Sequence, residues 1–339
     1  MKVLSLFDGI SCGMVALERA GIPVERYDAF EIDKYAVKVS EKNYPQIVHH
    51  GDVFEGDFTQ FKGYDLLLGG SPCTYWSIAK AGREVTPDGM GGKLFMQYVR
   101  ALRESGCKYF LYENNYSIHK DIKAFISQQL GVEPIMINSA LVSAQHRKRC
   151  YWTNIPNVTQ PEDRGILLKD VLENAVPWQD KSYCMTASYD GAVLWNTLER
   201  GQRTMVAVPV GAAQRGRYIQ SGNRSTKAEG GHDGAGIGGG EMGNGPKELV
   251  ISDGWVYANG GGQGAKTGLY KIDLPDGDYI IRKLTPVEAE RLQTLPDNYT
   301  AGISNTQRYK CIGNGWTVDV IAHILRYMRG ENDVDKNRR

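Results

Sequence analysis

A cysteine in a turn of small residues is the first candidate for chemistry in this chain. Cys73 follows Gly69-Gly70-Ser71-Pro72, and this turn comes directly after the apolar run 65–68. The proline stiffens the turn, and a following helix or a neighbouring cation would favour the thiolate form of the cysteine. A cysteine is more often a small buried apolar residue, but this one stands outside the apolar runs. The pattern therefore favours Cys73 as a nucleophile that Pro72 helps to present.

Charged side chains stand next to two further apolar runs and could assist such a nucleophile. Glu113-Asn114 follows the run 109–112, where aromatic neighbours could raise the pKa of the carboxyl group and let it donate a proton. Arg147 and Arg149 precede Cys150-Tyr151-Trp152 and share a face if this segment is extended. Two inward guanidinium groups need anionic or carbonyl partners. The competing interpretations are a surface turn for the acid and a solvated basic run for the arginines.

Three acids favour an adenosyl ligand that carries no phosphate. Asp8 lies in the turn Phe7-Asp8-Gly9, where it would repel a pyrophosphate but suit a cationic amino-acid group. Glu31 ends the second apolar run and is placed to accept both hydroxyl groups of a ribose. Asp52, in Gly51-Asp52-Val53, could accept from an adenine amino group. A turn or helix-cap carboxylate is the alternative for each acid, yet together they predict S-adenosylmethionine as the ligand.

The elements that would bring these residues together follow from the apolar pattern of residues 1–155. Short apolar runs alternate with helical patterns at the spacing of βα units, which is typical of an α/β fold with a parallel, doubly wound sheet. Ligands bind such sheets beyond the carboxyl ends of the strands, where the candidate residues fall. The expected strands are 3–7, 27–32, 65–68, 109–112 and 135–137, and the expected helices are 14–20, 34–42, 94–104 and 121–130.

Composition sets the broad class of the protein. The 339 residues include 40 Lys and Arg against 39 Asp and Glu, so a polyanion must bind through a local patch rather than a uniformly basic surface. No apolar run reaches the ~18 residues of a membrane span, and the apolar run at the N-terminus is too short for a signal peptide. We therefore expect a cytoplasmic protein. The six cysteines form no Cys-x-x-Cys pair, so we expect no metal site.

Six motifs, in their order along the chain, resemble those of the cytosine-5 DNA methyltransferase family. The nucleophile and cofactor loops are most similar to the animal de novo methyltransferases, while the glycine-rich segment indicates a bacterial or phage enzyme. Departures from the family pattern are local: Thr74, Asn115 and Gly315-Trp316 stand where glutamine, valine and Ser-Val are frequent. The matching segments are Phe7-Asp8-Gly9, Gly70-Ser71-Pro72-Cys73, Glu113-Asn114, Gln145–Arg149, Arg282–Gln293 and Lys310–Trp316.

The resemblance implies methyl transfer from S-adenosylmethionine, with S-adenosylhomocysteine as product, to carbon 5 of cytosine in a specific duplex DNA sequence. Cys73 would attack carbon 6 of a base flipped out of the helix, and Glu113 would bind ring nitrogen 3 and the exocyclic amine. Arg149 would bind the carbonyl at carbon 2, with Arg147 supporting it or a phosphate. Trp316 would stack on the adenine. The residues implied to hold the cofactor are Phe7, Asp8, Gly9, Glu31, Ile32, Asp52, Val53, Ser71, Asn314 and Trp316.

The resemblance also divides the chain into two domains. Residues 1–178 and 282–330 would form a discontinuous catalytic domain, with the helical stretch 318–328 packing back on its first part. Residues 179–281 would form a smaller, irregular, Gly-rich target-recognition domain, and 331–339 a disordered tail. Positions 200–230 carry six Lys and Arg against one acidic residue, a patch suited to phosphates. The candidate DNA contacts are Lys80 and Arg83, in a flexible basic segment after the nucleophile, and Arg203, Arg215, Arg217, Arg224 and Lys227.

Two alternatives to this function stay open at the level of the sequence. One branch of the family methylates transfer RNA, so the same chemistry could act on RNA. A catalytically silent, DNA-binding relative would instead regulate partners. The presence of Cys73, Glu113 and Arg149 favours an enzyme, and the basic recognition region favours duplex DNA as its partner. A companion restriction endonuclease is a further partner compatible with the family.

Overall fold

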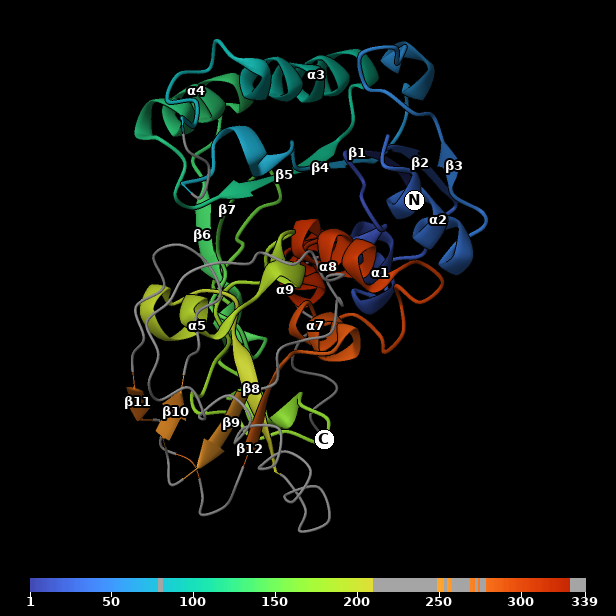
Figure 1. The fold of residues 1–339 in the computed structure, drawn as a ribbon. Helices are drawn as coiled ribbons and strands as arrows, with labels where there is room; N and C mark the ends of the chain where they lie inside the picture. Colours follow the sequence, from blue (N-terminus) through green and yellow to red (C-terminus); the bar gives the residue numbers. More distant parts are fainter. Residues whose placement is uncertain are drawn as a thin grey trace, which may run out of the picture.

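The centre of the molecule is a seven-stranded sheet with the strand order β3-β2-β1-β4-β5-β7-β6 (Figure 1). The computed structural model describes residues 1–78, 82–209, 249–252, 255–257, 269–271, 274 and 279–329, without the side chains of Cys73 and of strands 249–271. The strands of the central sheet are β1 (Lys2–Leu6), β2 (Arg26–Phe30), β3 (Val48–His49), β4 (Leu66–Gly69), β5 (Tyr109–Asn115), β6 (Ile135–Asn138) and β7 (Lys148–Thr153).

The sheet is mostly parallel, as expected, but one strand near its edge is reversed. β1 pairs in parallel with β2 and β4, and β4 pairs in parallel with β5. β7 runs antiparallel to both of its neighbours, β5 and β6. The expected parallel pairing thus holds for β1 to β5, and β7 is the strand that departs from it. Only residues 139–147 separate β6 from β7, whereas a parallel crossover needs about a dozen residues or more.

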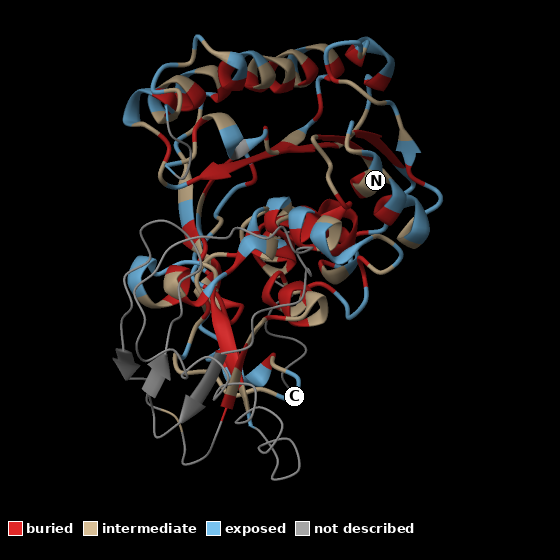
Figure 2. Ribbon diagram, in the orientation of Figure 1, coloured by how far each residue is buried: buried red, intermediate tan, exposed pale blue. Residues whose placement is uncertain are grey.

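Helices cover both faces of this sheet and divide the core into two clusters. α3 (Met90–Ser105) and α4 (Lys120–Leu130) lie on one face, and α1 (Cys12–Arg19), α2 (Lys34–Asn43) and α9 (Val318–Arg326) lie on the other (Figure 1). Successive side chains of a strand point to opposite faces. Leu67 accordingly packs under α3, while Leu66 and Leu68 pack against α1 and α9. The sheet is thus buried on both sides (Figure 2), and the expected α/β fold is confirmed.

The C-terminal helix closes the first part of the chain, as expected. α9 packs against α1, and the Arg19 Nη1 lies 2.7 Å from Asp319 Oδ1. The apolar positions of α9 are fully buried in the same cluster as α1, because they recur at helical spacing on one face. Residues near the C-terminus therefore return to the strand ends of the first part. The predicted tail, 331–339, lies outside the described residues.

A second, antiparallel sheet lies beside the first, with the strand order β11-β10-β9-β12-β8. It is more regular than the irregular domain that we expected. Its strand β12 crosses the predicted domain boundary at residue 281. A third core cluster joins β8 and β12 to α7 (Pro286–Leu292) and α8 (Asn305–Asn314). The other elements here are α5 (Leu194–Arg200), β8 (Met205–Pro209), β9 (Leu249–Ser252), β10 (Trp255–Tyr257), β11 (Leu269–Lys271) and β12 (Tyr279–Lys283).

The described part of the chain contains no helix with both the length and the apolar character needed to cross a bilayer.

Candidate active site

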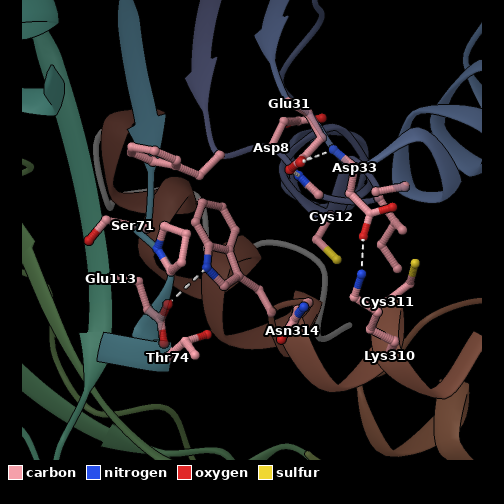
Figure 3. Close-up of a pocket in the computed structure, with 18 of the residues that line it drawn as sticks. Asp8, Cys12, Glu31, Asp33, Ser71, Thr74, Glu113, Lys310, Cys311 and Asn314 are labelled. Carbon is pink, nitrogen blue, oxygen red and sulfur yellow. Dashed lines mark hydrogen bonds and ion pairs between the residues drawn. The ribbon is translucent and has the colours of Figure 1, made fainter. Parts of the chain in front are cut away.

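A cavity of about 260 Å³ opens at the carboxyl ends of β1, β2, β4 and β5. The strand order reverses between β1 and β4, which is where doubly wound sheets bind their ligands. The end of α8, with Lys310, Cys311 and Asn314, forms part of the wall (Figure 3). Arg147 and Arg149, near the start of β7, also line the cavity. The predicted site residues that line the cavity are Phe7, Asp8, Gly9, Glu31, Ser71, Pro72, Glu113, Arg147, Arg149, Asn314 and Trp316.

Asp8 is held in the turn after β1 by three hydroxyl groups. Ser5 Oγ and Tyr27 OH donate to Asp8 Oδ1, each at 2.6 Å, and Ser11 Oγ donates to Oδ2 at 2.6 Å. A carboxylate offers about four lone-pair sites, so these bonds leave acceptor capacity for a ligand. The turn itself requires a positive φ of 62° at Gly9, a backbone conformation that glycine adopts without strain.

Glu31 connects the turn after β1 to the end of β2. Its Oε2 accepts from the backbone N–H of Gly9 at 2.8 Å, and its Oε1 accepts from the N–H groups of Ile32 and Asp33, both at 2.8 Å. Burial raises the pKa of Glu31 above its usual value, and these backbone donors partly offset the shift. The carboxylate is therefore fixed at the rim of the cavity, next to Asp8 (Figure 3).

A third acid, which the sequence did not single out, also faces the cavity. Asp33 caps α2 through the Tyr35 N–H at 2.9 Å, and its Oδ2 lies 2.7 Å from Lys310 Nζ. This ion pair neutralises the lysine, so Asp8 and Glu31 dominate the charge of this end of the cavity. Phe7, Ile10 and Ala36 supply apolar wall. An acidic, partly apolar site of this kind fits a cationic sulfonium and amino-acid group and disfavours phosphates, so the residues fit S-adenosylmethionine.

Three residues predicted to bind the cofactor do not line the cavity itself. The Asp52 carboxylate accepts from the Phe54 N–H at 2.9 Å, as a turn acid would. Val53 is buried, and Ile32 is 76% exposed directly after Glu31. Their roles toward the cofactor stay predictions. An isoleucine this exposed beside the cavity is available to an apolar ligand surface such as an adenine ring.

The nucleophile turn is attached to the strand that carries the acid. Cys73 begins a short 3₁₀ helix (Cys73–Tyr75) after β4, and its neighbours Pro72 and Thr74 both line the cavity. The Cys73 side chain lies outside the described residues. Asn114 Nδ2 donates to Tyr112 OH at 3.2 Å and to Ser71 O at 3.4 Å, and the Ser71 and Tyr112 hydroxyl groups lie 2.6 Å apart. These bonds fix the turn against β5.

The Glu113 carboxylate is held from both sides. Arg149 Nε lies 2.8 Å from its Oε1, and Trp316 Nε1 donates to its Oε2 at 3.1 Å (Figure 3). The side chains of Glu113 and Arg149 are each only 12% exposed. Glu113 was expected to follow its strand, but β5 extends to Asn115 because β7 pairs with it over 111–115. Acid and arginine therefore sit on rigid strands rather than in a surface turn.

Arg147 lines the same cavity as Arg149 but binds mainly backbone carbonyl groups. Its guanidinium is buried and donates to the backbone carbonyls of Met185 at 2.8 Å, Gly315 at 2.9 Å and Gly313 at 3.2 Å. A Cβ at Gly313 would come within 2.2 Å of the Thr186 carbonyl carbon, so the two segments that Arg147 joins are in direct contact. Arg147 thus holds the segment after α8 in place. We expected the guanidinium group of Arg147 to need anionic or carbonyl partners, and the structure provides backbone carbonyl groups of the protein.

Cys184 contacts both arginines of the cavity wall, a position that the sequence did not reveal. Its Sγ lies 3.5 Å from Arg147 Nη1 and 3.9 Å from Arg149 Nη2. Burial alone would raise the pKa of this thiol, but the two guanidinium groups outweigh it and the pKa lies below its usual value. Cys12 and Cys311 border the cavity, and burial raises the pKa of each to about 12.

The predicted DNA contacts are described in part. Arg83 Nη1 donates to Ser117 O at 2.8 Å. Arg203 donates to Gly191 O at 2.9 Å and to Ser188 Oγ at 3.0 Å. Both guanidinium groups therefore bind the protein itself, and their role in DNA binding stays a prediction. Lys80, Arg215, Arg217, Arg224 and Lys227 lie outside the described residues. Within the described residues, no group of three or more His, Cys, Asp and Glu side chains could hold a metal ion.

Comparison with known proteins assigns the motifs to one family. Residues 1–329 match the family model of the C-5 cytosine-specific DNA methylases. The type II methyltransferase M.HhaI of Haemophilus parahaemolyticus is 26% identical over 347 residues, which is 96% of this chain and 93% of that protein. The orphan methyltransferase M.SPRI of Bacillus phage SPR is 33% identical over 167 residues, which is 46% of this chain and 38% of that protein.

The chain thus spans well under two thirds of the phage relative, and a second phage relative, M.Rho11sI, is matched over 23% of its length. Solved structures show the same fold. A methyltransferase of Entamoeba histolytica, EhMeth, matches with a TM-score of 0.62 and 16% identity, covering 97% of each chain. A DNMT2 of Spodoptera frugiperda matches with a TM-score of 0.60 and 16% identity, covering 97% of this chain and 99% of that one.

Proposed function

This chain belongs to the C-5 cytosine-specific DNA methylase family, and from that premise we propose that it methylates carbon 5 of a cytosine in a specific sequence of duplex DNA. One observation carries the proposal. The carboxylate of Glu113 is held by Arg149 and Trp316 in the same cavity that the acids Asp8 and Glu31 border. A base-binding acid and a site for a cationic methyl donor therefore meet beside the nucleophile turn.

The cofactor end of the cavity is suited to S-adenosylmethionine. Bound there, this cofactor supplies a methyl group from a positively charged sulfonium and becomes S-adenosylhomocysteine. Asp8 would hold the amino group of its methionine part, and Glu31 would accept from the ribose hydroxyl groups. Asp52 and the exposed Ile32 would contact the adenine, with Val53 behind them. Asn314, exposed at the end of α8, lines the cavity and would hold the polar end of the ligand.

The nucleophile acts by forming and then breaking one bond. The Cys73 thiolate adds to carbon 6 of cytosine, and the electron pair of the 5,6 double bond makes carbon 5 nucleophilic. After carbon 5 accepts the methyl group, a base removes its proton. That electron pair restores the double bond and expels the sulfur as thiolate. The position of Cys73 between Pro72 and Thr74, both at the cavity, supports this role.

Glu113 and Arg149 hold the base during these steps. Addition of sulfur pushes electron density into the ring, toward nitrogen 3 and the carbonyl at carbon 2. Glu113 hydrogen-bonds or protonates nitrogen 3 and accepts from the exocyclic amine, and Arg149 donates to the carbonyl oxygen. The 2.8 Å contact between the two side chains fixes both before the base arrives. Preorganised groups of this kind lower the barrier because they need little rearrangement during the reaction.

The base must leave the duplex to reach this cavity, at a cost of a few kcal/mol. The segment after the nucleophile supports such a step. Ile78, Val85 and Met90 are exposed there, at 66%, 46% and 42%. Exposed apolar side chains beside a base-binding cavity can contact bases that have lost their stacking partners. We infer that residues 74–94 cover the flipped nucleotide and that residues 179–281 read the target sequence.

Duplex DNA is the substrate that the family model supports over RNA. Two relatives are named as type II methyltransferases, and two phage relatives are named as orphan methyltransferases. The proposal therefore places this enzyme with the DNA of a bacterial or phage-infected cell, in a restriction–modification setting. The type II relatives favour a companion restriction endonuclease as partner, whereas the two orphan relatives do not.

The proposal is tested by incubating the protein with isotopically methyl-labelled S-adenosylmethionine and either duplex DNA or transfer RNA. Each polymer is digested to nucleosides, and labelled 5-methylcytidine species are quantified by mass spectrometry. Label in DNA is the expected result, and bisulfite sequencing then gives the target sequence. Label in RNA alone would replace the substrate with transfer RNA. Label in neither polymer, with binding to DNA retained, would support a silent regulator instead.

A further inference from the structure

The indole of Trp316 bridges the two halves of the cavity. Its N–H donates to Glu113 Oε2 at 3.1 Å, at the end that would receive the base. A Cβ at Gly70 would lie 3.3 Å from the Trp316 Nε1 and 3.1 Å from Glu113 Oε2, so this glycine leaves the space that the pair occupies. At the opposite edge of the ring, a Cβ at Gly13 in α1 would lie 3.8 Å from Trp316 Cζ3. The ring therefore reaches from α1 to the end of β4.

The backbone on both sides of this tryptophan is fixed. Gly315 O accepts from Arg147 Nη2 at 2.9 Å and from Gln293 Nε2 at 3.1 Å. Thr317 Oγ1 donates to Gln293 Oε1 at 2.8 Å. Because the main chain is held by these buried bonds, the direction of the indole N–H is set by the fold rather than by solvent.

We propose that Trp316 is a positioning residue for Glu113, and that it links the occupancy of the cofactor end to the alignment of the base-binding acid. Trp316 lines the cavity together with Phe7 and Asn314, which are expected to hold the cofactor. A ligand bound there would restrict the indole ring. The ring N–H in turn fixes Glu113 Oε2, while Arg149 fixes Glu113 Oε1. This inference rests on the proposed function. It goes beyond the expected stacking on adenine, because stacking needs the ring alone and not its N–H donor.

The position of this donor in the sequence adds weight to the inference. Glu113 and Trp316 are 203 residues apart, and Gly70 lies beside their contact, where any side chain would crowd both groups. Three separate segments, those of Gly70, Glu113 and Trp316, are thus matched at this contact.

The sharpest test removes the N–H and keeps the ring. Trp316 is replaced by 3-benzothienylalanine, in which sulfur takes the place of the indole N–H at nearly the same shape, and in a second variant by phenylalanine. Trp178→Phe is the control, because Trp178 is half-buried, lies outside the proposed target-recognition region and does not line the cavity. The measurements are the dissociation constant of S-adenosylhomocysteine by calorimetry, and kcat and KM for duplex DNA containing the target.

We expect the benzothienyl variant to lose about tenfold in kcat, the effect of one hydrogen bond to a charged group. Its affinity for S-adenosylhomocysteine should stay within about twofold, and so should all values for Trp178→Phe. An unchanged kcat would overturn the inference, and so would a loss confined to cofactor affinity. Both results leave the proposed function standing. If the proposed function itself is wrong, the natural protein will methylate neither DNA nor RNA in the labelling assay, and this result is distinct from both outcomes above.

Discussion

Arg149 and Glu113 meet diagonally across two antiparallel strands, with Arg149 Nε 2.8 Å from Glu113 Oε1. In the register of β5 and β7, Arg149 lies opposite Asn115, two residues beyond Glu113. The three side chains therefore share one face of the sheet, the face that α1 and α9 cover. The reversed direction of β7 is what brings the start of that strand to the carboxyl end of β5. The contact between Glu113 and Arg149 therefore depends on the antiparallel direction of β7.

Replacing Arg147 should mainly lower stability, whereas replacing Arg149 should mainly lower activity. Arg147→Ala removes a buried guanidinium from three backbone carbonyls and should cost about 3 kcal/mol of unfolding free energy, as measured in urea. Arg149→Ala should lower kcat by about 100-fold and change stability by about 1 kcal/mol or less. Each variant is the other's control. Equal stability losses, or full activity in Arg149→Ala, would contradict this division.

Asp28 should make stability depend on acid pH. Its carboxylate is fully buried and accepts from Arg26 and from Tyr64 OH at 2.7 Å, with His50 Nε2 also at 2.7 Å. Burial opposes the charged form, but these hydrogen bonds prevail and hold the pKa of Asp28 below its usual 3.8. The carboxylate therefore stabilises the fold above pH 3.8, and this stabilisation is lost as pH falls through the lower, folded pKa.

Asp28→Asn should accordingly be about 2 kcal/mol less stable than the natural protein at pH 7, with the difference shrinking below about pH 4. Unfolding in urea across this pH range measures the difference. Asp88→Asn is the control, because Asp88 is a solvent-exposed acid just before α3. A gap between Asp28→Asn and the natural protein that is independent of pH would refute the account of Asp28.

Cys184, which contacts the two arginines of the cavity wall, should differ in reactivity from Cys12 and Cys311, which line the cavity. The two arginines lower the pKa of Cys184, whereas burial raises those of Cys12 and Cys311 to about 12. At pH 7.5, iodoacetamide should therefore modify Cys184 well before the other two, as peptide mapping by mass spectrometry would show. Arg149→Ala should slow this labelling. Faster modification of Cys12 or Cys311 would contradict the assignment.

Glu84 should control the order of the segment after the nucleophile. Its carboxylate accepts from Trp76 Nε1 at 3.2 Å and from the backbone N–H groups of Met90 and Gly91, at 3.0 Å and 3.1 Å. It thus caps α3 from within the loop. Glu84→Ala should speed hydrogen exchange in the first turn of α3 and cost about 1 kcal/mol, whereas Glu84→Gln should retain part of the protection. Unchanged exchange in Glu84→Ala would rule out this role.

Much of the first sheet could be predicted because its strands are continuous apolar runs. β1, β2, β4 and β5 and the helices between them follow from periodicity alone. The direction of β7 could not be predicted, because an apolar run carries no information on whether its partner is parallel. β3 has two residues, too few for a pattern. The short strands of the second sheet are interrupted by glycine-rich segments, which conceal their alternation.

The acids of the site could be predicted from their places at strand ends, but their partners could not. Arg147 contacts carbonyls 38 to 168 residues away, and a backbone acceptor leaves no trace in the residue types. Asp33 and Cys184 likewise gain their roles from tertiary neighbours. The indole N–H of Trp316 lies within reach of Glu113 only once α8 has packed against the sheet.

The central claim is that the Cys73 sulfur bonds to a flipped cytosine, and covalent trapping tests it most directly. The protein is incubated with S-adenosylmethionine and duplex DNA in which 5-fluorocytosine replaces the target base. Fluorine cannot leave as a cation, so the reaction should stop at a covalent complex that survives denaturation and maps to the peptide carrying Cys73, and Cys73→Ser should form none. A natural protein that forms no complex with DNA or RNA, or one that attaches through another cysteine, would contradict the account.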